Sequence, residues 1–149
     1  MNQAPSIRGF LSRYFPVFMG AILASVFSLA FAVPLFFESY FRDLSVADTA
    51  KYSFIGGIAL TMVIVHCNFM IARGHPQWVW PLVVLLGLCF ACVLPTIVYQ
   101  PHAFIYGVSV LLPLLALLLL NSKRHREMRQ KLVEVRHLRE AVIARHKAR

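Results

Sequence analysis

The chain has 149 residues, of which 59% are hydrophobic and 14% are charged, and its formal net charge is +9. A water-soluble domain of this size has too small an interior to bury so many apolar side chains. The composition therefore excludes an ordinary soluble globular fold and predicts an all-α integral membrane protein.

Four stretches of about 20 mostly apolar residues follow one another along the chain. Each is long enough to cross the ~30 Å hydrocarbon layer as an α-helix. The stretches are continuous rather than alternately apolar and polar, which favours helices over a membrane β-barrel. Because the connections are short, neighbouring helices should be antiparallel, giving an up-down four-helix bundle over residues 15–120. We expect its spans at about residues 15–37, 52–72, 78–99 and 102–120.

Basic residues are concentrated on one side of the predicted spans. Thirteen of the 15 Lys and Arg residues lie before the first span, in the second connection, or after Asn121. Only Arg42 and Lys51 lie on the other side. Cytoplasmic loops carry the excess of Lys and Arg, so both termini are expected in the cytoplasm, with a bacterial inner membrane as the location.

The segment before the first span, residues 1–14, is expected to be a short polar cytoplasmic terminus. Pro5 and Gly9 discourage a helix there. A cleaved signal peptide is the competing interpretation, because Ala30-Phe31-Ala32 resembles a cleavage site. The apolar stretch continues past that triplet, so we expect the first span to be retained.

The connections between the spans contain recognisable end signals for helices. Ser45-Val46-Ala47-Asp48 resembles a capping box, which predicts that the second helix begins before its membrane span does. In the next connection, Gly74 is expected to end a helix and Pro76 to begin one. Pro95 and Pro113 interrupt the third and fourth spans and predict kinks.

Small residues form the clearest periodic signal. On the first span they recur every four residues and share one face, which allows another backbone to approach closely. The second span carries small and polar residues on one face as well. The two faces can pair with each other, or dock a different membrane protein. The predicted helix-packing or partner interface consists of Gly20, Ala24, Ser28, Ala32, Gly57, Thr61 and Asn68.

His66, Cys67 and Asn68 place three polar groups in succession inside the second span. An ionisable residue within a membrane span is costly and points to a function. Consecutive residues on a helix point ~100° apart, so these three do not form one site. Asn68 is assigned to the packing face and Cys67 to packing. His66 is left as the candidate for a polar path or a pH-sensitive site, because histidine titrates near neutral pH.

Chemistry-bearing patterns are otherwise scarce. Cys89 and Cys92 form a C-x-x-C pair, which is typical of redox dithiols and metal sites. Both lie near the middle of the third span, which favours packing, although the redox reading stays open. No Asp, Glu, Lys or Arg lies inside a span, and no phosphate-binding loop or nucleophile elbow occurs. We therefore expect a protein that is not an enzyme, with no catalytic residues, cofactor or metal.

Residues 121–149 are expected to form a basic cytoplasmic helix. They contain ten Lys and Arg against three Glu, and no Gly or Pro, so the fourth helix is predicted to continue into them unbroken. A contact helix for a protein partner is the alternative, and nucleic acid is not expected because no folded reader accompanies the charge. Anionic lipids are expected to contact Lys123, Arg124, Arg126, Arg129 and Lys131.

These features predict a non-enzymatic protein that binds another membrane protein through helix–helix contacts. Two versions stay open, an accessory subunit of a larger assembly and an immunity-type protein that blocks a pore-forming toxin within the bilayer. The alternative is a small homo-oligomeric transporter or channel with a polar path at His66 and Asn68.

Overall fold

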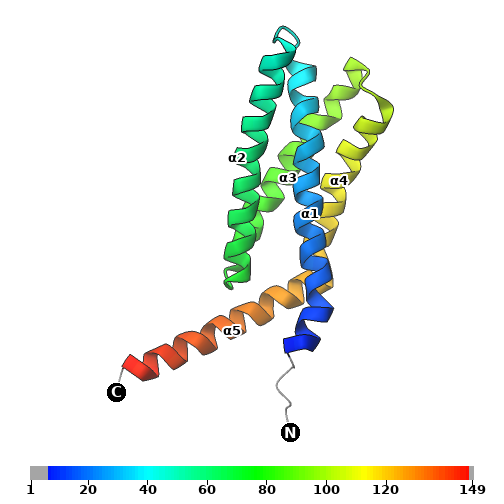
Figure 1. Ribbon diagram of the computed structural model, residues 1–149. Helices are drawn as coiled ribbons and strands as arrows, with labels where there is room; N and C mark the ends of the chain where they lie inside the picture. Colours follow the sequence, from blue (N-terminus) through cyan, green and yellow to red (C-terminus); the bar gives the residue numbers. More distant parts are fainter. Residues whose placement is uncertain (1–6, 148–149) are drawn as a thin grey trace.

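The computed structural model describes residues 7–147, and every regular element in this range is helical (Figure 1). Four stretches are long and apolar enough to cross a membrane: Ser12–Tyr40, Val46–Ala72, Pro76–Tyr99 and Ala103–Asn121. The all-helical prediction and the number of apolar helices are confirmed. The elements are α1 (Ile7–Tyr40), α2 (Val46–Ala72), η1 (Pro76–Trp78), α3 (Val79–Val93), η2 (Leu94–Tyr99), α4 (Ala103–Asn121) and α5 (Lys123–Lys147).

Helix α1 lies between α2 and α4, and α3 lies behind it (Figure 1). It makes its most extensive contacts with α4 and also packs against α2 and α3. Helix α5 runs across one end of these helices, which we call the α5 end; the opposite end, with the α1–α2 and η2–α4 connections, is the distal end. The core consists of small and aliphatic side chains from all four helices, including Ala21, Ala24, Leu29, Ile64, Ile71, Leu82, Leu86, Ala116 and Leu120.

The start of α2 follows the predicted capping box. The Ser45 side chain accepts a hydrogen bond from the backbone N–H of Asp48 at 3.1 Å, and its hydroxyl donates to the Asp48 carboxylate at 2.7 Å. The helix begins at Val46, ahead of residue 52, where the sequence predicted the start of the apolar span.

Helix α1 begins earlier than the sequence suggested. It starts at Ile7 and passes through Gly9 and Pro16, so the expectation of a non-helical segment is wrong for residues 7–14. The physical reason is a distant contact: Tyr14 is buried, and its hydroxyl donates a hydrogen bond to the Glu127 carboxylate on α5 at 3.1 Å. The prediction for residues 1–6 lies outside the described residues.

The turn between α2 and η1 requires a glycine, as the sequence indicated. Gly74 has φ +86°, and the N–H groups of Gly74 and His75 donate to the carbonyls of Ile71 and Met70 at 2.9 and 3.1 Å. A Cβ atom at Gly74 would lie 2.8 Å from the Leu132 carbonyl oxygen of α5. The positive φ of Gly74 and its close contact with α5 thus each exclude a side chain at this residue.

The two prolines that predicted kinks, Pro95 and Pro113, act differently. Pro95 lies where α3 gives way to the tighter 3₁₀ helix η2, whereas Pro113 is buried inside α4 without ending it. Only the third span therefore changes helix type at its proline.

The expected continuation of the fourth helix is wrong. Ser122 has an extended backbone (φ −61°, ψ 148°), and its hydroxyl accepts a hydrogen bond from the His125 N–H at 3.2 Å. Serine is a preferred N-cap residue, so it ends α4 and starts α5 although neither Gly nor Pro is present. The chain turns at this point, and α5 runs crosswise under the other helices (Figure 1).

Replacing Gly74 with Ala should destabilise the fold by about 1–2 kcal/mol, because a Cβ atom disfavours positive φ and here also meets the Leu132 carbonyl. Thermal unfolding in mild detergent measures the loss, and hydrogen exchange should show faster exchange in α5. Gly107→Ala is the matched control, since nothing lies within 4 Å of a Cβ there. Equal stability of the two variants would contradict the expectation.

Candidate functional site

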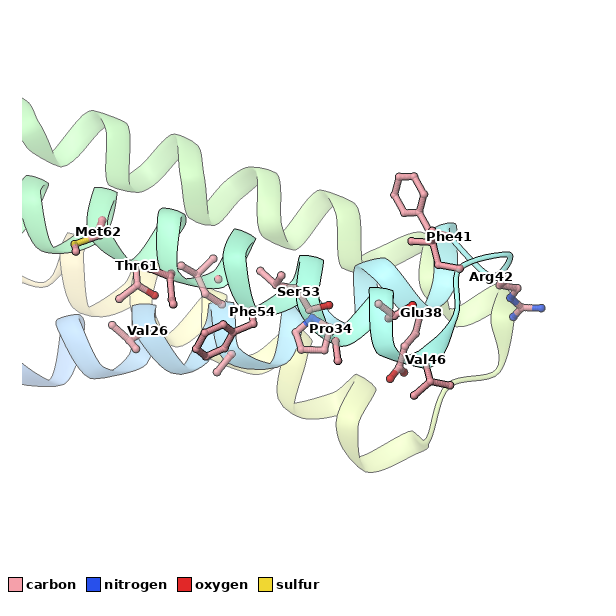
Figure 2. A pocket seen from close by; sticks show the side chains of 18 residues that line it. Val26, Pro34, Glu38, Phe41, Arg42, Val46, Ser53, Phe54, Thr61 and Met62 are labelled. Atoms are coloured by element: carbon pink, nitrogen blue, oxygen red, sulfur yellow. The ribbon is translucent and has the colours of Figure 1, made fainter.

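An open groove runs between α1 and α2 toward the distal end of the molecule (Figure 2). Its volume is about 870 Å³. Apolar side chains cover most of its length, and Glu38 and Arg42 lie at its distal mouth (Figure 2). On α2 the small and polar residues Ser53, Gly57 and Thr61, spaced by four, line its wall.

The groove exists because α2 packs tightly along only part of its length. Its buried residues all lie between Ile64 and Ile71, near the α5 end. None of residues 46–63 is buried, and part of this stretch borders the groove instead of packing closely against α1.

Two adjacent glycines on α2 differ in their surroundings. A Cβ atom at Gly56 would contact Phe37 and Val33 of α1 at 3.8 and 3.9 Å, whereas at Gly57 nothing lies within 4 Å. The absence of a side chain at Gly57 is therefore not required by packing among the described residues. Near it, Ser53 Oγ is buried and has no hydrogen-bond partner within residues 7–147.

The distal mouth of the groove carries both signs of charge. The Arg42 guanidinium lies over the Tyr99 ring at 4.5 Å and donates a hydrogen bond to the Tyr99 carbonyl at 3.4 Å. Glu38 is exposed and takes part in no ion pair within the described range. A carboxylate is thus available where the groove opens.

The small residues of α1 lie inside the molecule. Ala24, Ser28 and Ala32 are buried, and a Cβ atom at Gly20 would meet Leu119 of α4 at 3.6 Å. Of the predicted interface, these four residues serve packing within the chain, while Gly57 and Thr61 line the open groove.

The polar residues on the two small-residue faces, Ser28 on α1 and Asn68 on α2, do not hydrogen-bond to each other. Asn68 is buried, and its side-chain amide donates to the Ile64 carbonyl of its own helix at 2.8 Å. Ser28 Oγ has no partner among the described residues. Both groups are therefore accommodated in the core without linking α1 to α2.

The consecutive residues His66, Cys67 and Asn68 point in different directions, as expected. His66 is exposed, and its ring meets the Trp78 ring edge-on with centroids 5.1 Å apart. Cys67 is buried in the core. Thr61 faces the groove, so the structure does not bring His66, Asn68 and Thr61 together along one path within a single copy.

Residues able to bind a metal or undergo redox chemistry are dispersed. Cys89 is half-buried, Cys92 is exposed, and both are free thiols. Across residues 7–147, no three His, Cys, Asp or Glu side chains come together as metal ligands.

The five basic residues assigned to lipid contact fall into two groups. Lys123, Arg124 and Arg126 are exposed, whereas Arg129 and Lys131 are half-buried. Lys131 lies over the Tyr14 ring at 5.2 Å. Burial, together with the charge of Arg126, lowers the pKa of Arg129.

His125, which the sequence analysis did not single out, is the most completely buried ionisable residue of α5. It is 1% exposed, lies beside the Phe18 ring, and has no hydrogen-bond partner for either ring nitrogen in the described part of the chain. Burial and the neighbouring Arg129 lower its pKa to about 4. A sequence signal was available, because Met128 and Leu132 follow His125 at steps of three and four residues and therefore share its helix face.

Comparisons with protein-family models, curated proteins and solved structures give no match for this chain. Its function is therefore argued from its own geometry.

His125 should make the packing of α5 sensitive to acid. Its pKa falls from the ordinary 6.5 to about 4 in the folded protein. The unfolded chain therefore binds more protons between these values, so stability should decrease as the pH falls from 6.5 toward 4. Thermal unfolding at pH 7.5 and pH 5.0 measures this, and His125→Leu should flatten the dependence. His137→Leu, at an exposed position of α5, should leave it unchanged; equal flattening by both variants would count against a special role for His125.

Proposed function

We propose that this chain is a non-enzymatic, multi-pass protein of a bacterial inner membrane that binds a transmembrane helix of another membrane protein. The four apolar helices form an up-down bundle, both termini are cytoplasmic, and the α5 end is the cytoplasmic end. The groove between α1 and α2 is the docking site.

The observation that carries this proposal is the uncrowded Gly57. A helical glycine costs about 1 kcal/mol relative to alanine, and packing within this chain does not require one here. Helices associate in lipid where small residues let backbones approach closely. Ser53, Gly57 and Thr61 present such a face to an open groove. Gly87 and Gly107 are also uncrowded, but they lie outside the groove.

The length of the groove suits a transmembrane helix. Its α1 wall runs from Val26 to Glu38, which at 1.5 Å per residue is about 18 Å, more than half of the ~30 Å hydrocarbon thickness. The unpartnered Ser53 hydroxyl offers an interhelical hydrogen bond, worth about 0.6 kcal/mol on average in membranes. Glu38 at the distal mouth offers a charged contact outside the hydrocarbon layer.

The chemistry of the described helices supports a binding role over catalysis. Glu38 and Arg42 at the groove mouth are the charged residues that line it, and no carboxylate lies along its apolar length. An accessory subunit and an immunity-type protein would use the groove in the same way. Deletion followed by a toxin-sensitivity assay separates them, since only an immunity role predicts sensitised cells.

Filling the groove should abolish partner binding. A photo-crosslinking residue at Phe54, a groove residue that is 70% exposed, should capture a distinct membrane protein in intact cells, whereas one at Leu118, which is 69% exposed on α4, should not. Gly57→Leu should reduce the Phe54 adduct at least about tenfold, equivalent to about 1.4 kcal/mol. Gly87→Leu is the matched control and should leave it intact.

Three outcomes would contradict the proposal: no adduct from position 54, equal adducts from both positions, or an unchanged adduct in Gly57→Leu. Mass spectrometry of the adduct tests the alternative function. Capture of a second copy of this chain would replace partner binding by homo-oligomer formation, as a transporter or channel requires.

A further inference from the structure

A second cavity, of about 430 Å³, lies at the α5 end between α3, α4 and α5. It is separate from the groove, because α1 and α2 contribute no residue to it. Its lining consists of Pro76, Val79, Trp80, Val83, Leu117, Leu120, Asn121, Arg126 and Arg129.

The lining of this cavity has two chemically distinct parts. The membrane helices α3 and α4 contribute mainly apolar side chains, such as Val83 and Leu117, whereas α5 contributes two arginines. Trp80 at its edge is strongly exposed, as tryptophans at membrane interfaces are. An apolar cleft between α3 and α4 thus ends in a cationic site on α5.

The two arginines have no carboxylate of their own. In the described part of α5, Glu127 pairs with Arg13 and Glu140 with Arg136, and no acidic residue lines the cavity. Arg126 donates a hydrogen bond to the Asn121 side chain, which is neutral. Two neighbouring cations therefore face the cavity without a counter-charge.

Arg129 shows the effect of this arrangement most clearly. Its Nε is buried and has no hydrogen-bond partner among the described residues. Burial and the charge of Arg126 both lower its pKa. An anion held between the two guanidinium groups would accept hydrogen bonds from Arg129 and relieve the repulsion between the cations.

We infer that this cavity binds the phosphate group of an anionic phospholipid, with the phosphate on Arg126 and Arg129 and an acyl chain between α3 and α4. The planar guanidinium matches phosphate oxygens in bidentate geometry. Basic pockets between membrane helices on the cytoplasmic side suit such headgroups. A soluble phosphate shares the same chemistry at the arginines, but it would leave the apolar walls at Val83 and Leu117 without an occupant.

This inference goes beyond the proposed docking function. It rests on the membrane location of the four helices but not on the α1–α2 groove. A lipid held there would bridge α5 to α3 and α4, so one binding event would set the position of the basic helix.

Native mass spectrometry of the full-length protein in mild detergent tests the inference, with phosphatidylglycerol as the anionic probe and phosphatidylcholine as the neutral one. The wild type should retain phosphatidylglycerol at least about tenfold more than phosphatidylcholine. Arg126→Gln with Arg129→Gln should abolish this preference. The matched control, Arg139→Gln with Arg145→Gln, removes the same charge from exposed positions of α5 outside the cavity and should change retention less than about twofold.

Equal loss in the two double variants would overturn the inference in favour of diffuse attraction between α5 and the lipids. Because Arg129 is partly buried, the single variant Arg126→Gln provides a test at an exposed position, with circular dichroism confirming the fold. Undiminished retention in this folded variant would also overturn the inference.

The source of the phosphate is distinguished in two further arms. Val83→Phe, which fills the apolar part of the cavity, should weaken phosphatidylglycerol binding and leave inorganic phosphate binding unchanged. Displacement of the lipid by inorganic phosphate, together with unchanged lipid binding in Val83→Phe, would assign the site to a soluble phosphate and overturn the lipid assignment.

Discussion

Close approach of backbones along α1 is the interaction on which the rest of the structure depends. Lipid chains are as apolar as leucine side chains, so helices in a membrane are held together mainly by tight packing. The buried Ala24, Ser28 and Ala32 remove bulk from α1 where the neighbouring helices meet it. The Ser25 side chain is also buried, and its hydroxyl donates a hydrogen bond to the Ala21 carbonyl of the same helix at 2.7 Å. Every other long helix contacts α1.

The α5 end is held together by contacts of a different kind. Tyr14 of α1 donates its hydroxyl to Glu127, and the backbone of Leu132 lies against Gly74 in the turn after α2. His125 is inserted beside Phe18. Helix α5 thus contacts α1, α2 and α4 at one end, while an open groove runs between α1 and α2 toward the other. The groove between α1 and α2 and the cavity lined by Arg126 and Arg129 lie toward different ends of the molecule.

Local features of this fold were predictable because neighbouring residues produce them. The number of apolar helices, the cap at Ser45 and the turn at Gly74 each follow from a short stretch of sequence. The start of α1 did not follow from local sequence. Tyr14 and Glu127 are 113 positions apart, and no propensity of residues 7–14 reveals that a distant carboxylate will meet them.

The sequence by itself determined which side of each helix carries small residues, since a spacing of four places them on one face. By that criterion the face with Gly20 on α1 and the face with Gly57 on α2 are alike. Only the tertiary structure decided that the first is covered by α4 and other helices, whereas the second borders an open groove. The reason is physical: helical periodicity defines a face, but what covers that face depends on where the neighbouring helices pack.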